Sequence, residues 1–186
     1  PEELKIELDE LVVEHRIVPF LETFCAAPAL EGGRLHAVIV ENKNGRQAIR
    51  SGYFIDATGD ADLARSAGVA CREAGALQPP TTCAKIQGLA TLKEFNWTQA
   101  ISRHGPAFGL EGDWGWGSVI PGLHDIQMRA DNHVFQTDVS DADQLTRGEI
   151  EGRRKIRAFL DVLRRHGPPG VQVGRVALAA TPGGRE

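Results

Sequence analysis

The residues with the clearest capacity for chemistry stand in one short run, Asp56-Ala57-Thr58-Gly59-Asp60. Glycine lets the backbone approach a ligand closely, and the free amides at the start of a helix attract phosphate or hydroxyl groups. If a helix begins after Gly59, this turn could bind part of a cofactor. A structural interpretation stays open beside it, in which Gly59 turns the chain and Asp60 caps the helix.

The cysteines and histidines offer little organised chemistry. Three cysteines without a C-x-x-C pair argue against a disulfide framework or a structural zinc site. The spacing closest to that of a metal site occurs at His124, Asp125, Asp131 and His133. We interpret these four residues as part of a polar loop rather than as metal ligands. His104, His124 and His133 are acid–base candidates, but nothing in their spacing separates them from surface histidines. No metal site is predicted, and no catalytic residue is named.

The elements around the Asp56–Asp60 run are predicted to form one corner of a doubly wound sheet. Tyr53–Ala57 is a mostly apolar run typical of a buried parallel strand. A helix is predicted over 61–67, and Gly68 ends it. Ligands bind at the carboxyl ends of such strands, which is where residues 57–60 would lie.

The rest of the chain gives a coarser pattern. A helix is predicted over 1–15, an edge or leading strand over 16–26 and a hairpin over 35–50, whose Asn44-Gly45 turn is typical of tight hairpins. Further on, the sequence predicts a strand over 82–89, a helix over 94–104 and an irregular glycine-rich loop over 105–122.

A long helix should follow near 146–166. Thr146-x-x-Glu149 matches a capping box, so the helix is expected to begin at Thr146, and Gly167 should end it. Its basic run, 153–157, is predicted to be a solvated face rather than a nucleic-acid patch. The predicted buried stripe consists of Ile150, Ile156, Phe159, Leu160 and Leu163.

Four stretches, in order, resemble the FAD-dependent oxidoreductase family, whose cofactor domain is glutathione-reductase-like. Ala57-Thr58-Gly59 matches its Ala-Thr-Gly segment, and the hairpin around Gly45 resembles its β-insertion. Leu145–Arg153 is similar to its LTRAEIEGR helix, and Gly183–Glu186 to its G-x-R-E segment. The resemblance implies an α/β fold that becomes α+β in the second half. It places an incomplete FAD/NAD(P)-binding-type domain with a β-hairpin insertion over 1–75 and a substrate-side region over 76–186.

The same resemblance implies which residues contact FAD. Cys25 would make a backbone contact near the adenine, although a small buried apolar residue explains it equally well. Gln78, Thr81 and Arg185 would lie on the flavin side. The remaining expected cofactor contacts are Ala57, Thr58, Gly59 and Asp60.

The family's G-x-G-x-x-G, which holds the pyrophosphate, is absent from these 186 residues. The chain opens on Pro1 and its only methionine is Met128, so we expect an internal portion of a longer coding sequence. FAD is then expected in the intact protein rather than on this chain alone, where a hydride would pass from an unidentified organic substrate to the flavin. The alternative is a non-catalytic interaction domain that keeps an oxidoreductase-like core.

The amino-acid composition limits the classes of partner that the protein is expected to bind. Lys and Arg number 21 against 25 Asp and Glu, a net charge of −4, which argues against a nucleic-acid binder. No apolar run is long enough to span a membrane, and nothing at the start resembles a secretory signal. The expected partner is a small-molecule substrate, and the expected location is the cytoplasm, where cysteines stay reduced.

Overall fold

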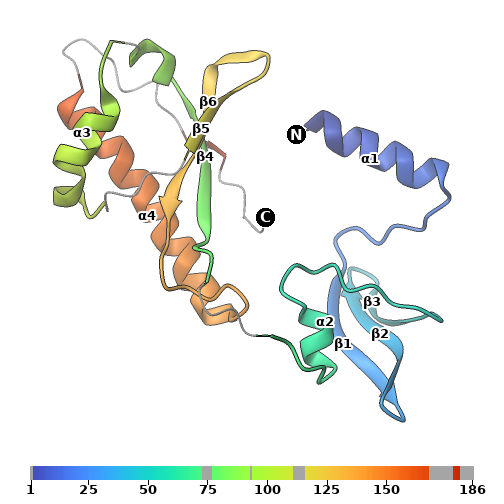
Figure 1. Ribbon diagram of the computed structural model, residues 1–186. Helices are drawn as coiled ribbons and strands as arrows, with labels where there is room; N and C mark the ends of the chain where they lie inside the picture. Colours follow the sequence, from blue (N-terminus) through green and yellow to red (C-terminus); the bar gives the residue numbers. More distant parts are fainter. Residues whose placement is uncertain (1, 73–76, 93, 111–115, 168–177, 181–186) are drawn as a thin grey trace. The chain divides into compact units, whose positions relative to one another are not determined.

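The computed structural model describes residues 2–72, 77–92, 94–110, 116–167 and 178–180. The chain divides into two compact units, the N-terminal unit (Pro1–Glu73) and the C-terminal unit (Ala74–Glu186). Both mix helices and strands, as expected of the α/β class (Figure 1). All strand pairs among the described residues are antiparallel, so the predicted doubly wound parallel corner is not seen there. Within the same ranges, no helix combines the length and apolarity that a bilayer crossing requires.

The N-terminal unit is built on a three-stranded meander in the order β1-β2-β3. Its elements are α1 (Glu2–Glu14), β1 (Phe24–Glu31), β2 (Arg34–Asn42), β3 (Gly45–Arg50) and α2 (Asp62–Ser66). The predicted hairpin is confirmed, and Gly45 has the positive φ of 93° that its turn requires. The helix predicted over 1–15 is confirmed as α1, although its apolar stripe stays in solvent, with Leu4 61% exposed.

Two strand predictions in this unit are wrong. Segment 16–26 becomes a strand only at Phe24, because its pairing with β2 begins there and pairing outweighs local β propensity. Tyr53–Ala57 is not a buried strand: it pairs with no described strand, and Tyr53 is 92% and Ile55 91% exposed. A strand needs a neighbour for its amides and carbonyls, and the described residues provide none at this run.

The C-terminal unit contains a four-stranded sheet in the order β5-β6-β4-β7. Its elements are β4 (Thr81–Gln87), η1 (Leu89–Leu92), α3 (Trp97–His104), η2 (Gly105–Phe108), β5 (Trp116–Ile120), β6 (Leu123–His133), α4 (Ala142–His166) and β7 (Leu178–Ala180). The strand predicted over 82–89 and the helix predicted over 94–104 are confirmed as β4 and α3.

The irregular loop predicted over 105–122 is wrong in part, because it contains η2 and β5. Its middle, 111–115, lies outside the described residues. Glycine misled the prediction at Gly117, which is a strand residue. The guanidinium of Arg129, opposite on β6, occupies the space that a Cβ at Gly117 would need. This glycine therefore lies against a side chain of the neighbouring strand and does not mark a turn.

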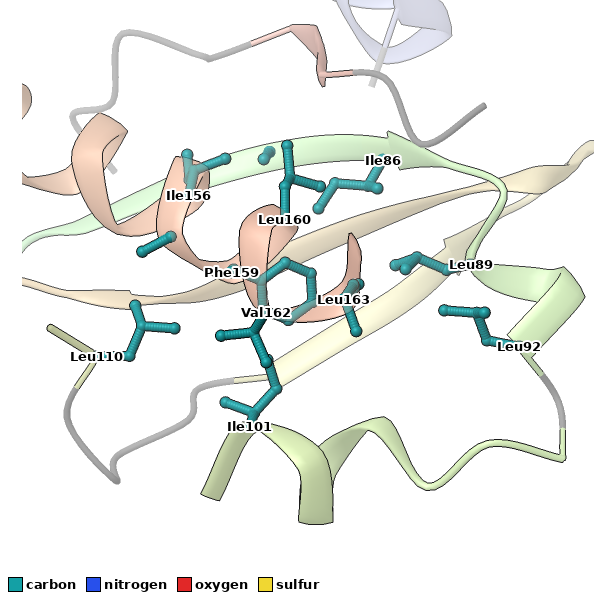
Figure 2. Packing of buried hydrophobic residues seen from close by; sticks show 12 residues of the cluster. Ile86, Leu89, Leu92, Ile101, Leu110, Ile156, Phe159, Leu160, Val162 and Leu163 are labelled. Atoms are coloured by element: carbon teal, nitrogen blue, oxygen red, sulfur yellow. The ribbon is translucent and has the colours of Figure 1, made fainter. Parts of the chain in front are cut away.

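Helix α4 packs on one face of the sheet and supplies much of the core (Figure 2). The labelled core residues are Ile86, Leu89, Leu92, Ile101, Leu110, Ile156, Phe159, Leu160, Val162 and Leu163. The predicted stripe is thus confirmed from Ile156 onward. It is wrong at Ile150, which is 59% exposed although it falls in the predicted pattern.

The start of α4 was also predicted wrongly. The helix begins at Ala142, where the Asp141 side chain accepts a hydrogen bond from the Gln144 amide at 2.8 Å. The Gln144 side chain reaches back past the cap and accepts from the Asp138 amide, whereas in a capping box it would accept from the Asp141 amide, which here donates to the Asp138 carbonyl. Thr146 sits inside the helix and donates its hydroxyl to the Ala142 carbonyl at 2.8 Å. The upstream Asp-x-x-Gln pair is therefore the true cap.

Candidate functional site

In the N-terminal unit, the Asp56 carboxylate organises the turn that precedes α2. Its Oδ1 accepts from the Thr58 amide at 3.1 Å and the Thr58 hydroxyl at 2.7 Å, and its Oδ2 accepts from the Ala64 amide at 2.9 Å. Thr58 Oγ1 in turn accepts from the Asp62 amide at 2.9 Å. The bonds from the Thr58 hydroxyl and the Ala64 amide lower the pKa of Asp56 from its ordinary 3.8. The carboxylate is therefore charged at neutral pH and ties the turn to the helix.

Asp60 does not cap α2, which corrects the structural interpretation of this turn. Ala61 occupies the N-cap position with φ at 55° and has no capping side chain. Asp56 and Thr58 satisfy the first helical amides instead. Sequence reasoning missed this role of Asp56, although the Asp-x-Thr spacing is a signal for a side chain that bonds to its own turn.

Three consecutive amides in this turn, those of Gly59, Asp60 and Ala61, have no acceptor among the described residues. Gly59 has a φ of 89° and Ala61 one of 55°, so the turn is curled by left-handed conformations. Successive amides in such turns can form a concave donor group for anions. A Cβ on Gly59 would meet no atom within 4 Å, so the adjacent space is open. A donor group of this kind is chemically suited to a phosphate or hydroxyl oxygen.

Cys25, on β1, lies beside this turn. Its side chain is exposed, so the interpretation of Cys25 as a small buried residue is wrong. Partial desolvation raises the pKa of its thiol, and the carboxylates of Asp56 and Asp62 raise it further. A thiol with a raised pKa is protonated at neutral pH and is a poor nucleophile. Cys25 thus lies near the predicted cofactor turn, with a thiol that is harder to ionise than an ordinary cysteine.

The C-terminal unit holds a second polar cluster, at the start of β4. Thr81 Oγ1 and His133 Nδ1 are 2.6 Å apart on facing positions of β4 and β6. Behind them, Lys155 on α4 donates from Nζ to the His133 carbonyl at 2.8 Å. The Val134 amide donates to the Pro80 carbonyl at 2.9 Å, which closes the sheet on the same side. Thr81, a predicted cofactor contact, is therefore bonded to a histidine from a distant part of the sequence.

Lys155 was missed because its basic neighbours suggested a solvated face. It is only 7% exposed, whereas Arg153 and Arg154 lie at the surface and bond to Glu149 and Glu151. The usable signal was helical spacing, since position 155 falls one turn after the buried Gly152 on the same face. A run of like charges can thus hide one inward-facing member.

The remaining candidates lie apart. His124 and His133 stand at the two ends of β6, which places them roughly 30 Å apart at about 3.3 Å per residue. The described residues contain no group of three metal-ligating side chains. His104 stacks on His166 with ring centroids 3.7 Å apart. Gln78 is exposed just before β4, and Arg185 lies outside the described residues.

Comparison with known proteins identifies a family. The family model described as FAD dependent oxidoreductase matches residues 1–186. No curated protein matches the chain significantly, and no solved structure does so.

Proposed function

The chain belongs to the FAD dependent oxidoreductase family, and from this premise we propose that the protein oxidises a small organic molecule with FAD as the hydride acceptor. The observation that carries the proposal is the family match along the whole chain. The Asp56–Asp62 turn supports it, because its geometry suits a polar group of such a cofactor. When bound, FAD supplies the two-electron chemistry, and the protein supplies orientation and electrostatics.

We assign the Thr58–Asp60 turn to holding the cofactor. The amides of Gly59 and Asp60 would donate to a phosphate or hydroxyl oxygen, and Asp56 would keep the turn in shape from behind. Ala57 and Cys25 would line the same place, because Ala57 follows Asp56 in the chain and the Asp56 carboxylate helps to raise the pKa of the Cys25 thiol. From the resemblance, Gln78, Thr81 and Arg185 are proposed as further cofactor contacts.

The first test is whether the natural gene product that contains these residues carries flavin. We expect a yellow protein that releases FAD on denaturation and binds it again when FAD is added. A well-folded, colourless gene product that takes up no FAD would refute the proposal and favour a non-catalytic interaction domain. The readout is flavin absorbance, and it needs no knowledge of the substrate.

A matched pair of glycine variants tests the turn itself. Gly59 and Gly68 have φ values of 89° and 75°, and a Cβ on either would meet no atom within 4 Å. Gly59→Ala and Gly68→Ala therefore carry a similar backbone penalty of about 1 kcal/mol. We expect Gly59→Ala to lose FAD and Gly68→Ala to retain it. Equal retention in both variants would remove Gly59 from the cofactor site.

A further inference from the structure

Two histidines from distant parts of the sequence lie against each other in the C-terminal unit. The ring of His104, the last residue of α3, stacks on the ring of His166, the last residue of α4, with centroids 3.7 Å apart and an angle of 3° between the planes. Phe108 of η2 meets the His166 ring edge-on, with centroids 6.1 Å apart. Both histidines are half-buried. The stack therefore joins the end of α3, and the η2 turn that follows it, to the last turn of α4.

Apolar packing beneath the stack holds the same corner to α4. Ile101 of α3 and Leu110, just after η2, are buried in the core cluster that also contains Val162 of α4 (Figure 2). The Leu110 amide donates to the Gly105 carbonyl at 3.0 Å, which closes the turn. These contacts involve no ionisable side chain. A change in the charge of the two histidines is therefore expected to loosen only the outer part of the corner, residues 104–109.

The charges around the stack are mostly positive. Three arginines stand in the last turns of the two helices, namely Arg103, Arg164 and Arg165. The four residues of η2, Gly105–Phe108, have no ionisable side chain. On α4, the carboxylate nearest to His166 in the sequence belongs to Asp161, which bonds to Arg164 at 2.8 Å and to Arg157 at 3.4 Å. The carbonyl ends of both helices attract cations and partly offset these charges.

The state of the stack depends on pH because both rings are imidazoles. Desolvation lowers the pKa of His104, and the neighbouring His166 and Arg103 lower it further. His104 is therefore uncharged at neutral pH, and its ring stacks without repulsion. Histidine side chains acquire protons between about pH 8 and pH 5, so acid places positive charge on this pair.

We propose that the His104–His166 stack is a pH-sensitive contact that holds residues 104–109 against the end of α4 at neutral pH and releases them in acid. Two imidazolium rings at this spacing repel each other, which weakens their contact by about fivefold even at the dielectric constant of water. Phe108 loses its edge-on contact with His166 when the rings separate. The core beneath stays packed, so the release is local and reversible.

Titration of the histidine rings, followed by ¹H NMR in the folded protein, tests the coupling between them. His166→Phe keeps an aromatic ring in the stack but removes its charge. His104 should therefore bind its proton about fivefold more tightly in His166→Phe than in the wild type. If His104 titrates at the same pH in both proteins, the two rings do not interact, and the proposal is overturned.

Hydrogen exchange tests whether the corner is released. The Gly109 amide donates to the Pro106 carbonyl at 3.1 Å. Its protection, relative to the intrinsic exchange rate at each pH, should fall about fivefold between pH 7 and pH 5 in the wild type. At pH 5 the Val162 amide should remain better protected than that of Gly109. Equal protection of the two amides would mean that the corner opens only when the whole unit unfolds, which overturns a local release.

Three variants complete the exchange experiment. His166→Phe and His104→Phe each leave one titrating ring in the stack, so the protection of Gly109 should be the same at both pH values. His124→Phe is the matched control, because it alters an exposed histidine of β6 in the same unit, and it should behave as the wild type does. Unchanged protection in the wild type, or the same loss in all three variants, overturns the proposal.

Discussion

Gly152 lies where α4 crosses the start of β4, and its replacement by alanine tests that packing directly. A Cβ at this position would stand 2.7 Å from Thr82 Cβ and closer still to Thr82 Oγ1. Thr82 is buried, and its Cβ is fixed by the strand backbone, so rotation of the side chain cannot relieve the collision. Gly152→Ala must therefore move the helix away from the strand.

The change in the free energy of unfolding caused by Gly152→Ala is the sum of two opposing contributions. Alanine stabilises a helix interior by about 1 kcal/mol relative to glycine. An extra methyl group forced into a packed interior costs about 1–3 kcal/mol, and a Cβ–Cβ distance of 2.7 Å places this case at the upper end of that range. The net loss in the free energy of unfolding is about 2 kcal/mol, which corresponds to a decrease in Tm of roughly 4–8 °C.

Urea unfolding followed by tryptophan fluorescence is the suitable assay, because Trp97, Trp114 and Trp116 all belong to the C-terminal unit. Gly148→Ala is the matched control on the same helix, where the new Cβ would meet only Thr137 Cγ2, at 3.1 Å. It should change stability by no more than about 1 kcal/mol.

Thr82→Ala in the Gly152→Ala background should recover part of the loss, because it removes Oγ1 while the fixed Cβ remains. The packing argument is refuted if Gly152→Ala unfolds at or above the wild-type urea midpoint, or if both glycine variants lose the same stability.

Two further predictions concern pH. Asp56→Ala should speed hydrogen exchange at the Ala64 amide. The difference from wild type should disappear as the pH falls from 3.8 through the lowered pKa of Asp56, because the stabilising form is the carboxylate. Asp60→Ala should leave that exchange unchanged, and equal effects of the two variants would contradict the role of Asp56. Burial lowers the pKa of His104, with His166 and Arg103 lowering it further, so below 6.5 the unfolded chain binds more protons than the folded one. Stability should therefore fall as the pH drops below 6.5, and less so in His104→Leu. Parallel urea midpoints from pH 7 to pH 5 in both proteins would contradict this.

The elements that the sequence predicted well are those whose signals are local. The hairpin around Gly45 needs only a turn of the right handedness between two strands, and both requirements lie within a few residues. The helix over 94–104 likewise contains its own cap, since Asn96 accepts from the Gln99 amide. The local chemistry of the turn and of the cap accounts for these elements.

The errors occur where a partner elsewhere in the chain decides. Tyr53–Ala57 has the composition of a buried strand, but burial requires a neighbouring strand, and composition does not provide one. Lys155 has the charge of a surface residue, but the His133 carbonyl lies within reach and satisfies its ammonium inside the fold. In both cases the structure depends on residues that are distant in the sequence, so the neighbouring residues alone could not predict it.

Two glycines, one in the Ala-Thr-Gly segment and one in the long-helix motif, also show that distant neighbours determine a residue's role. Gly59 and Gly152 look alike in sequence, and the resemblance covers both. Gly59 has a positive φ and open space beside it, so its freedom serves the backbone and leaves room for a ligand. Gly152 is an ordinary helical residue whose missing side chain makes room for Thr82. Because Thr82 is the neighbour of Thr81, that close approach also fixes the strand that holds the Thr81–His133 pair. The helix motif therefore helps to position this pair, although the pair itself lies outside the motif.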